Sequence, residues 1–366
     1  MVVKPKYRLL LLFCIIAITA RAQQNQLPGF NLGDAAPPFR VGGWIKGTPV
    51  KRFEKGKFYV VEFWATYCKP CIAAMPHLSA LAREYKDRVT FLAIDVYEAR
   101  TTPADRVKTF VEGMGDRMDF NVAQEDTSFT VNDWLRATGE QDNGIPRTFV
   151  VDAQGRLAWI GHPKDLDKVL GKVVNNTWDI KEAVAKRDAD KYLADMDHDA
   201  GYKLSKFDGG YDKPGDLGKP DSALLAINEI VKKEPKAKYA PVIALFTFSA
   251  LLKTNPDEAY AYGKAAIVTP TYEEPAYDAI IANIRQYSGK LNIPAKIYLL
   301  GAETYQAKMD HFPYPELYIT AERYQTMAKW YSLAGDTLKA TEAREKANKL
   351  EADEAIKKQL AAIVIK

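Results

Sequence analysis

The chain has 366 residues, of which 47% are hydrophobic and 27% are charged. This is the composition of a globular protein, and the length exceeds one ordinary domain, so we expect two domains. Intrinsic disorder and collagen-like repeats are excluded. The formal net charge of +4 equals the charge of four basic residues near the N-terminus. The remainder of the chain is therefore neutral and has no electrostatic reason to bind nucleic acid.

Residues 1–22 have the pattern of a signal peptide. A basic start precedes an apolar run over residues 9–19, and Ala20-Arg21-Ala22 has the small-x-small pattern of a signal-peptidase site. We therefore expect a periplasmic or otherwise exported protein that is cleaved after Ala22. The alternative is an uncleaved signal anchor at the membrane, although the run is shorter than the ~20 apolar residues that span a bilayer.

Residues 27–174 are expected to form an α/β domain. Runs of β-branched and aromatic residues predict strands, and apolar residues at helical spacing predict helices. The expected strands are 57–65, 89–96, 118–123, 147–152 and 157–160. The expected helices are 72–85, 103–113 and 129–138. Strands that alternate with helices and end in a hairpin predict an α/β sandwich around one central mixed sheet.

Residues 179–366 carry a helical pattern without strand signals. The segment 207–220 is dense in Gly, Pro and Asp, which predicts an exposed loop. Beyond this segment, helix starts recur at nearly regular intervals. They lie at Asp221, Asp257, Pro294 and Asp336. The spacing predicts an all-α domain of stacked helical hairpins of the tetratricopeptide type, although the consensus sequence of that repeat is degraded.

Only two cysteines follow the predicted leader, which contains Cys14. Cys68 and Cys71 are too few for a disulfide scaffold, and they lie between a strand end and a helix start. A thiol at a helix N-terminus faces unpaired N–H groups and the positive end of the helix dipole, which lower its pKa. We therefore expect Cys68 to attack a partner disulfide and Cys71, one turn further into the helix, to resolve the mixed disulfide. Lys69 adds a positive charge beside the attacking thiol.

Four other residues near the cysteines are candidates for the site. Glu62 is a lone carboxyl in an apolar strand, and burial would raise its pKa and suit it to accept a proton from Cys71. A carboxyl that only reaches the sheet edge or pairs with a lysine is the alternative. Trp64 and Tyr67 flank the thiols as packing residues and, secondarily, as partner contacts. Pro146 precedes a strand, and its own sequence leaves both the cis and the trans peptide bond open.

These motifs, in this order, resemble the thioredoxin superfamily over residues 27–174, and most closely its exported TlpA/ResA-like thiol-disulfide oxidoreductases. The resemblance rests on the Trp-Ala-x-x-Cys-x-x-Cys unit between strand and helix, on Pro76, on Gly-Ile-Pro at 144–146 and on Gly161. It implies that Pro146 is cis and faces the cysteines, and that the backbone of Ile145 holds the incoming peptide.

The resemblance also assigns roles to single residues. It implies that Glu62 corresponds to the buried aspartate of thioredoxin, and that Pro76 is the proline that kinks the active-site helix. Tyr67 departs from the tryptophan that usually precedes the first cysteine, which keeps an aromatic wall but leaves the reduction potential open. The resemblance and the Lys-Pro pair between the cysteines favour a reductase.

Three other functions are alternatives to this one. Two thiolates attract soft ions such as Cu(I), but His77 falls on a different helical azimuth and no third ligand has a recognisable spacing. A thiol peroxidase is disfavoured because residues 61–68 lack the Pro-x-x-x-Thr-x-x-Cys motif of peroxiredoxins. A helical adaptor with an accessory redox domain remains an alternative, in which the helical half selects the partner.

The sequence therefore predicts an exported dithiol–disulfide oxidoreductase without a bound cofactor or metal. Its expected substrates are disulfide-containing exported proteins. A membrane electron donor would have to reduce the pair again if the protein works as a reductase.

Overall fold

The computed structural model describes residues 29–38, 40–98, 103, 105–125, 129–139, 144–207, 218–272, 274–311 and 319–364. The chain divides into two compact units, Met1–Val184 and Ala185–Lys366. The predicted signal peptide and most of the predicted loop 207–220 lie outside the described residues.

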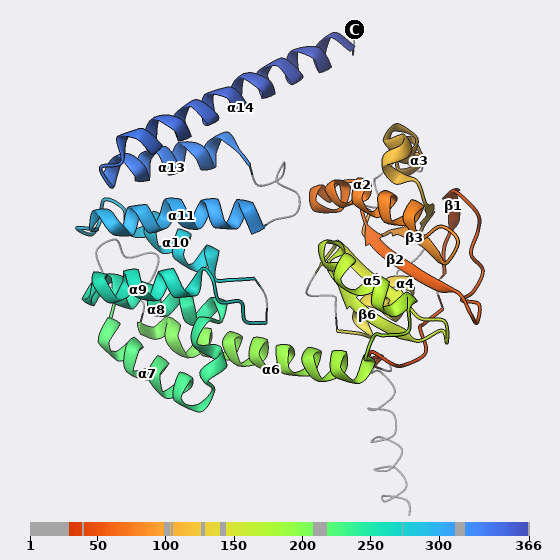
Figure 1. Cartoon of the computed structure of the whole chain (residues 1–366), viewed down its shortest axis with the longest axis horizontal. Helices are drawn as coiled ribbons and strands as arrows, with labels where there is room; N and C mark the ends of the chain where they lie inside the picture. The colour runs from red at the N-terminus through yellow and green to blue at the C-terminus, as the bar shows by residue number, and fades with distance from the viewer. Residues whose placement is uncertain are drawn as a thin grey trace, which may run out of the picture. The chain divides into compact units, whose positions relative to one another are not determined.

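The first unit is built on one six-stranded sheet with the order β1-β4-β3-β2-β5-β6. Its strands are β1 (Gly43–Lys46), β2 (Phe58–Trp64), β3 (Val89–Asp95), β4 (Asn121–Gln124), β5 (Arg147–Val151) and β6 (Leu157–Gly161). The neighbours β2–β3 and β3–β4 are parallel and the other pairs are antiparallel. The predicted sandwich around one mixed sheet is confirmed (Figure 1).

Both faces of this sheet are covered, so the central strand β2 is buried along its whole length. The helices of this unit are α2 (Lys69–Glu84), α3 (Arg106–Met114), α4 (Phe129–Val131) and α5 (Asp167–Val174). On one face, Val61 and Phe63 belong to a core with Trp134, which follows α4. Side chains alternate along a strand, so Glu62 and Trp64 point to the opposite face. Trp64 packs there on Phe110 of α3, with ring centroids 5.6 Å apart.

The elements differ from the predicted ones in four places. Strand β1 was not predicted, because it has only four residues and is not buried on either face. The helix expected over 129–138 is the short α4 followed by a π-helical turn, Asn132–Arg136. The strand expected from residue 118 begins at Asn121, since Gly115–Met118 forms a 3-10 turn. Helix α5 was not predicted as a separate element.

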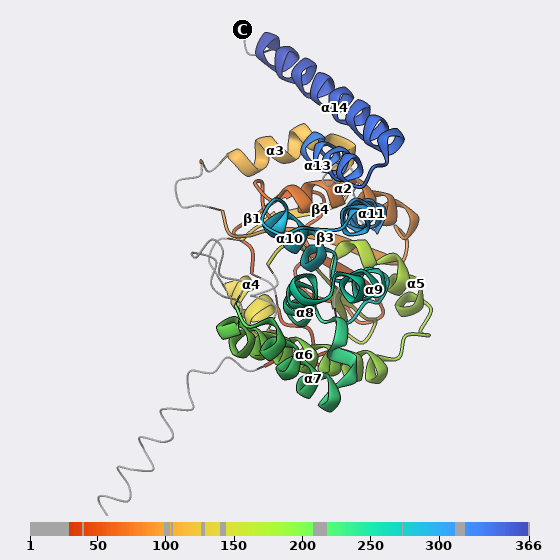
Figure 2. The same ribbon diagram turned by 90° about the vertical axis from the view of Figure 1, so that its left-hand side faces the viewer.

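The second unit is all-α, as the sequence predicts. Its helices are α6 (Ile180–Leu204, which begins in the first unit), α7 (Pro220–Lys233), α8 (Pro241–Thr254), α9 (Pro256–Ala266), α10 (Tyr277–Tyr287), α11 (Ala295–His311), α13 (Ala321–Leu333) and α14 (Thr337–Val364). Helix pairs α8–α9, α10–α11 and α13–α14 form hairpins, and α10 packs on α8 while α11 packs on both α9 and α13. Figures 1 and 2 show these hairpins stacked on one another.

Three of the four predicted helix starts mark the second helix of a hairpin, because α9, α11 and α14 begin at residues 256, 295 and 337. The fourth, Asp221, lies at the start of α7. Close approach of the stacked helices depends on glycine at two of these helices. A Cβ added to Gly263 would lie 2.5 Å from Leu300, and one added to Gly301 would lie 2.7 Å from Trp330. The stack therefore has no room for a larger side chain at either position.

A buried aspartate links two helices of this unit. Asp197 of α6 is fully buried. Its Oδ1 accepts a hydrogen bond from the backbone N–H of Ile243 (2.8 Å), and its Oδ2 accepts one from Val242 (2.9 Å). The hydroxyl of Tyr272 also donates to Oδ2, at 2.7 Å. Asp197 thus supplies the capping acceptor for α8, whose own N-cap residue Ala240 makes no side-chain cap.

We expect Asp197→Ala to lower the free energy of unfolding of the helical unit by about 3 kcal/mol, because it leaves buried N–H groups without an acceptor. The matched control is Asp195→Ala on the same helix, where the side chain is 66% exposed and pairs with Lys191. That change should cost less than about 0.5 kcal/mol. Urea unfolding followed by circular dichroism measures both, and equal midpoints for the two variants would contradict the capping role.

Candidate active site

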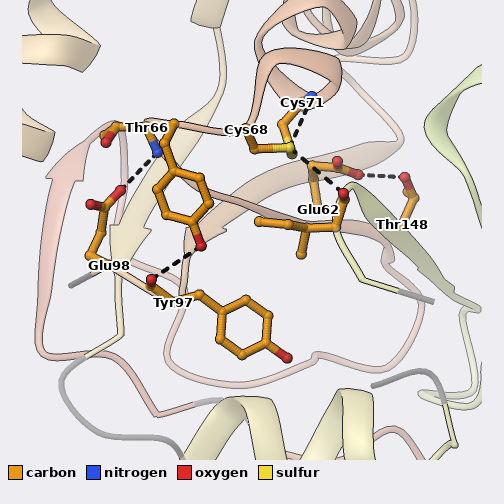
Figure 3. The surroundings of a disulfide bond; sticks show 9 residues. Glu62, Thr66, Cys68, Cys71, Tyr97, Glu98 and Thr148 are labelled. Carbon is orange, nitrogen blue, oxygen red and sulfur yellow. Dashed lines mark hydrogen bonds between the residues drawn. A yellow bond between two sulfur atoms is a disulfide. The ribbon is translucent and has the colours of Figure 1, made fainter. Parts of the chain in front are cut away.

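The two cysteines lie at the junction between β2 and α2. Cys68 is the N-cap residue of α2, with Pro70 in the first turn and Cys71 inside the helix. The two sulfurs form a disulfide with an S–S distance of 2.04 Å. The backbone N–H of Cys71 lies 3.3 Å from Cys68 Sγ, toward which it donates (Figure 3). This is the helix N-terminal environment that the sequence predicts for Cys68.

Burial distinguishes the two sulfurs. Cys68 is 7% exposed, whereas Cys71, on the buried side of α2, is fully buried. The buried side of α2 also includes Ala74, Met75 and Leu78, which fix the helix on the sheet. Because only Cys68 reaches the surface, it is the sulfur that an incoming disulfide can meet. Pro76 lies inside α2, as the resemblance implies.

The Ile145–Pro146 peptide bond is cis, as the resemblance implies. The fold brings this bond to the disulfide from 77 residues away in the sequence, and the carbonyl oxygen of Ile145 lies 3.7 Å from Cys68 Sγ. An extended peptide that pairs with the backbone at Ile145 would therefore pass beside the accessible sulfur. Such pairing is a common mode of peptide recognition at an exposed backbone edge.

Glu62 lies on the sheet face that α2 covers, and it is only 2% exposed. Its neighbours across the sheet are Ala93 on β3 and Thr148 on β5, so no lysine faces it from either strand. The hydroxyl of Thr148 donates to Glu62 Oε2, while Oε1 is buried without a hydrogen-bond partner. Burial raises the pKa of Glu62 to about 8, although the Thr148 hydrogen bond and the charge of Arg147 oppose the rise.

The two aromatic candidates occupy different environments. Tyr67 is 56% exposed, and its hydroxyl donates to the carbonyl oxygen of Tyr97 at 3.2 Å. Trp64 is fully buried against Phe110, so its side chain packs inside the domain and offers no surface to a partner. Of the two residues, only Tyr67 is available for partner contact.

The nearest histidine in sequence, His77, is engaged elsewhere. Its Nε2 lies 2.8 Å from Asp167 Oδ2, which links α2 to α5. Within the described part of the chain, no three His, Cys, Asp or Glu side chains are grouped so that they could hold a metal ion.

Three polar residues of the site were not assigned by sequence reasoning. Thr148 was predicted only as part of the strand 147–152, and its hydrogen bond to Glu62 depends on strand pairing. Asp95 at the end of β3 is 1% exposed, and Glu98 follows it in the next loop, where its Oε1 accepts a hydrogen bond from the Thr66 N–H at 2.8 Å. Asp95 carried the same signal as Glu62, a single carboxyl in an apolar strand, and could have been found by it.

This arrangement is suited to dithiol–disulfide exchange. It provides an accessible sulfur at a helix N-terminus, a buried second sulfur and a buried carboxyl whose pKa is close to neutral pH. The two cysteines themselves carry the two electrons of the exchange.

Part of the chain is similar to known proteins. Residues 50–114 match the family model described as Thioredoxin. The protein FixW of Rhizobium leguminosarum is 35% identical over 156 residues, which are 40% of this chain and 68% of FixW. The thiol-disulfide oxidoreductase ResA of Bacillus thuringiensis (strain Al Hakam) is 30% identical over 35% of this chain and 67% of its own length.

Two solved structures are similar to part of this chain. The thioredoxin domain of a thiol-disulfide oxidoreductase from Bacteroides vulgatus is 24% identical, with a TM-score of 0.32, and covers 40% of this chain and 99% of that domain. A thiol:disulfide interchange protein from Bacteroides sp. is 25% identical, with a TM-score of 0.33, over 40% of this chain and 91% of that one.

The fold and the cysteine pair define a thioredoxin-like oxidoreductase. The chain belongs to the thioredoxin superfamily, and it is a ResA/TlpA-like thiol-disulfide oxidoreductase that carries a C-terminal helical unit.

Proposed function

We propose that this protein is an exported reductase of protein disulfides. Cys68 attacks the disulfide of an exported partner, Cys71 resolves the mixed disulfide, and the backbone at Ile145 holds the partner's chain. Glu62 accepts the proton that Cys71 loses. A membrane electron donor then reduces the Cys68–Cys71 disulfide again.

The observation that carries the direction of electron flow is the electrostatic surrounding of Cys68. A dithiol is a strong oxidant when its reduced form is stabilised, chiefly through the thiolate of the attacking cysteine. Here Cys68 is only 7% exposed. Burial disfavours a thiolate, and Glu62, whose pKa is raised to about 8, is mostly uncharged at neutral pH. The reduced form is therefore weakly stabilised, which favours a reductant.

We expect the reduction potential of the Cys68–Cys71 pair to lie near the value of about −270 mV that is typical of thioredoxin. Equilibration of the mature protein in glutathione or dithiothreitol buffers, followed by counting of free thiols, measures it. A value near −120 mV, about that of the oxidant DsbA, would mean that the protein donates disulfides and would overturn the proposed direction.

Export is proposed from the basic, apolar and small-x-small pattern of residues 1–22. Among the described residues, no helix has both the length and the apolar character needed to cross a bilayer. Cell fractionation with mass spectrometry of the N-terminus tests the proposal, and we expect the exported form to begin at Gln23. A protein that keeps residues 1–22 in the membrane fraction would instead support the signal anchor.

A further inference from the structure

A second buried carboxyl lies on the same sheet face as Glu62, one strand away. Asp95 is the last residue of β3 and is paired in register with Trp64 of β2. A side-chain hydrogen bond joins Asp95 to Glu98, and a hydrogen bond between two carboxyl groups requires one proton. Burial first, and then the charge of Glu98, raise the pKa of Asp95 to about 8. The raised pKa of Asp95 favours retention of the shared proton at neutral pH.

Glu98 connects this pair to the loop that carries the attacking cysteine. Its Oε1 accepts the backbone N–H of Thr66 at 2.8 Å, and Thr66 lies two residues before Cys68. Next to it, the hydroxyl of Tyr67 donates to the carbonyl oxygen of Tyr97 at 3.2 Å. Both residues between Ala65 and Cys68 are therefore held by the loop that follows β3, as Figure 3 shows for Thr66 and Glu98.

We propose that Glu98 is a positioning residue for Cys68, and that the proton on Asp95 holds Glu98 in place. Asp95 donates to Glu98, and Glu98 accepts the Thr66 N–H, so the proton on Asp95 supports the hydrogen bond that holds Thr66. The inference concerns the exchange reaction itself and is independent of the direction in which electrons flow.

The groups that face Asp95 determine what happens when it ionises. From its own loop Glu98 acts on it, and from β4 the amide of Gln124 bonds to it while the adjacent Glu125 adds a second negative charge. From the loop before α2 Tyr67 faces the pair, and its pKa is raised first by burial and then by the charges of Glu98 and Asp95. Ionised Asp95 would repel Glu98 and could no longer donate to it. The Thr66 N–H would then lose its acceptor as the pH rises through about 8.

Two variants test the connection, each in the oxidised protein so that thiols do not titrate. Glu98→Ala should make the Thr66 amide exchange with deuterium about 10-fold faster, because its hydrogen bond is lost. Asp95→Asn should keep the Thr66 protection, because an amide can donate to Glu98 at every pH. The matched control is Glu112→Gln on α3, whose side chain is 65% exposed and which should change nothing.

The pH dependence separates this role from simple structural support. In the wild type, Thr66 protection, corrected for intrinsic exchange, should fall about 10-fold between pH 7 and pH 9, whereas Asp95→Asn should keep it. Repeating the comparison in a Glu62→Gln background removes the other carboxyl that titrates near pH 8. Identical pH profiles for the wild type and Asp95→Asn would overturn the proposal, as would unchanged protection in Glu98→Ala. If Glu98→Ala does not fold, the nearly isosteric Asp95→Asn comparison alone decides.

A functional readout accompanies the exchange measurement. Glu98→Ala should lower kcat for disulfide exchange about 5- to 10-fold with a smaller change in KM, because a misplaced Cys68 affects the reaction more than partner binding. An unchanged kcat together with faster Thr66 exchange would show that the loop tolerates the loss, and would exclude the positioning role.

Discussion

Replacing Cys71 by serine is expected to convert the protein into a trap for its partners. Cys68 keeps its place at the N-cap of α2 and can still attack a disulfide, but no second thiol then breaks the mixed disulfide. Intramolecular groups act at effective concentrations of about 10⁵ M or more, far above any external thiol, so turnover should fall by on the order of 100-fold or more. Partners should accumulate as covalent adducts on Cys68.

Non-reducing electrophoresis and mass spectrometry of the exported fraction measure the adducts. The matched control is Cys68→Ser, which should form no adducts and show no exchange, because the remaining Cys71 is fully buried. Adducts that form with Cys68→Ser and not with Cys71→Ser would reverse the two roles. A complete absence of adducts in both variants would argue against exchange through a mixed disulfide.

Replacing Glu62 by glutamine is expected to slow turnover about 100-fold at pH 7, the typical contribution of a general acid–base group. Cys71 must lose a proton before it attacks, and Glu62 lies under α2 with a pKa raised to about 8 by burial. The resolving step in the wild type should speed up as the pH rises through this value, because only ionised Glu62 accepts a proton. The glutamine variant should lack that rise.

Alkylation of Cys68 by iodoacetamide provides the control for this variant. Attack by Cys68 precedes the step that uses Glu62, so the alkylation rate should change little. Turnover equal to that of the wild type would remove Glu62 from the site, whereas an equal loss in both measurements would indicate a general disturbance of the active site.

The same substitution has an opposite effect on stability. The folded protein holds the Glu62 proton up to about pH 8, while the unfolded chain releases it near the ordinary value of 4.5. The raised pKa therefore lowers the free energy of unfolding. This loss is absent below pH 4.5 and grows as the pH rises toward 8. At about 1.4 kcal/mol per pH unit, Glu62→Gln should raise the free energy of unfolding by about 3 kcal/mol at pH 7.

Urea unfolding of the oxidised protein at pH 5 and pH 8 measures this gain. The exposed Glu112→Gln serves as the matched control, because it removes one carboxylate without removing a buried one. A gain that is the same at both pH values would mean that the pKa of Glu62 is not raised in the folded protein.

Much of the first unit could be predicted because its signals are local. The strands β2 and β3 are continuous apolar runs, and the helix after Cys71 shows its buried residues at helical spacing. Strand β1 lacks such a signal, since it is stabilised by antiparallel pairing with β4 rather than by its own residues. In the second unit the repeat length was visible, but the first helix of each hairpin had no distinct start signal.

The sequence by itself determined the chemistry of this protein. Two cysteines separated by two residues at a strand-to-helix junction define a redox-active pair, because the capping position and the helix dipole are properties of neighbouring residues. The lone carboxyl at Glu62 was likewise visible as an exception within an apolar strand.

Only the tertiary structure decided which groups surround that pair. Ile145 is 77 residues from Cys68, Thr148 is 86 residues from Glu62, and Glu98 is 32 residues from Thr66. All three contacts depend on strand order, and the Glu62–Thr148 contact also depends on register, since a shift of one residue would turn either side chain to the other face of the sheet. A sequence pattern reports local conformation and burial, whereas hydrogen-bond partners across a sheet are fixed only when the strands assemble.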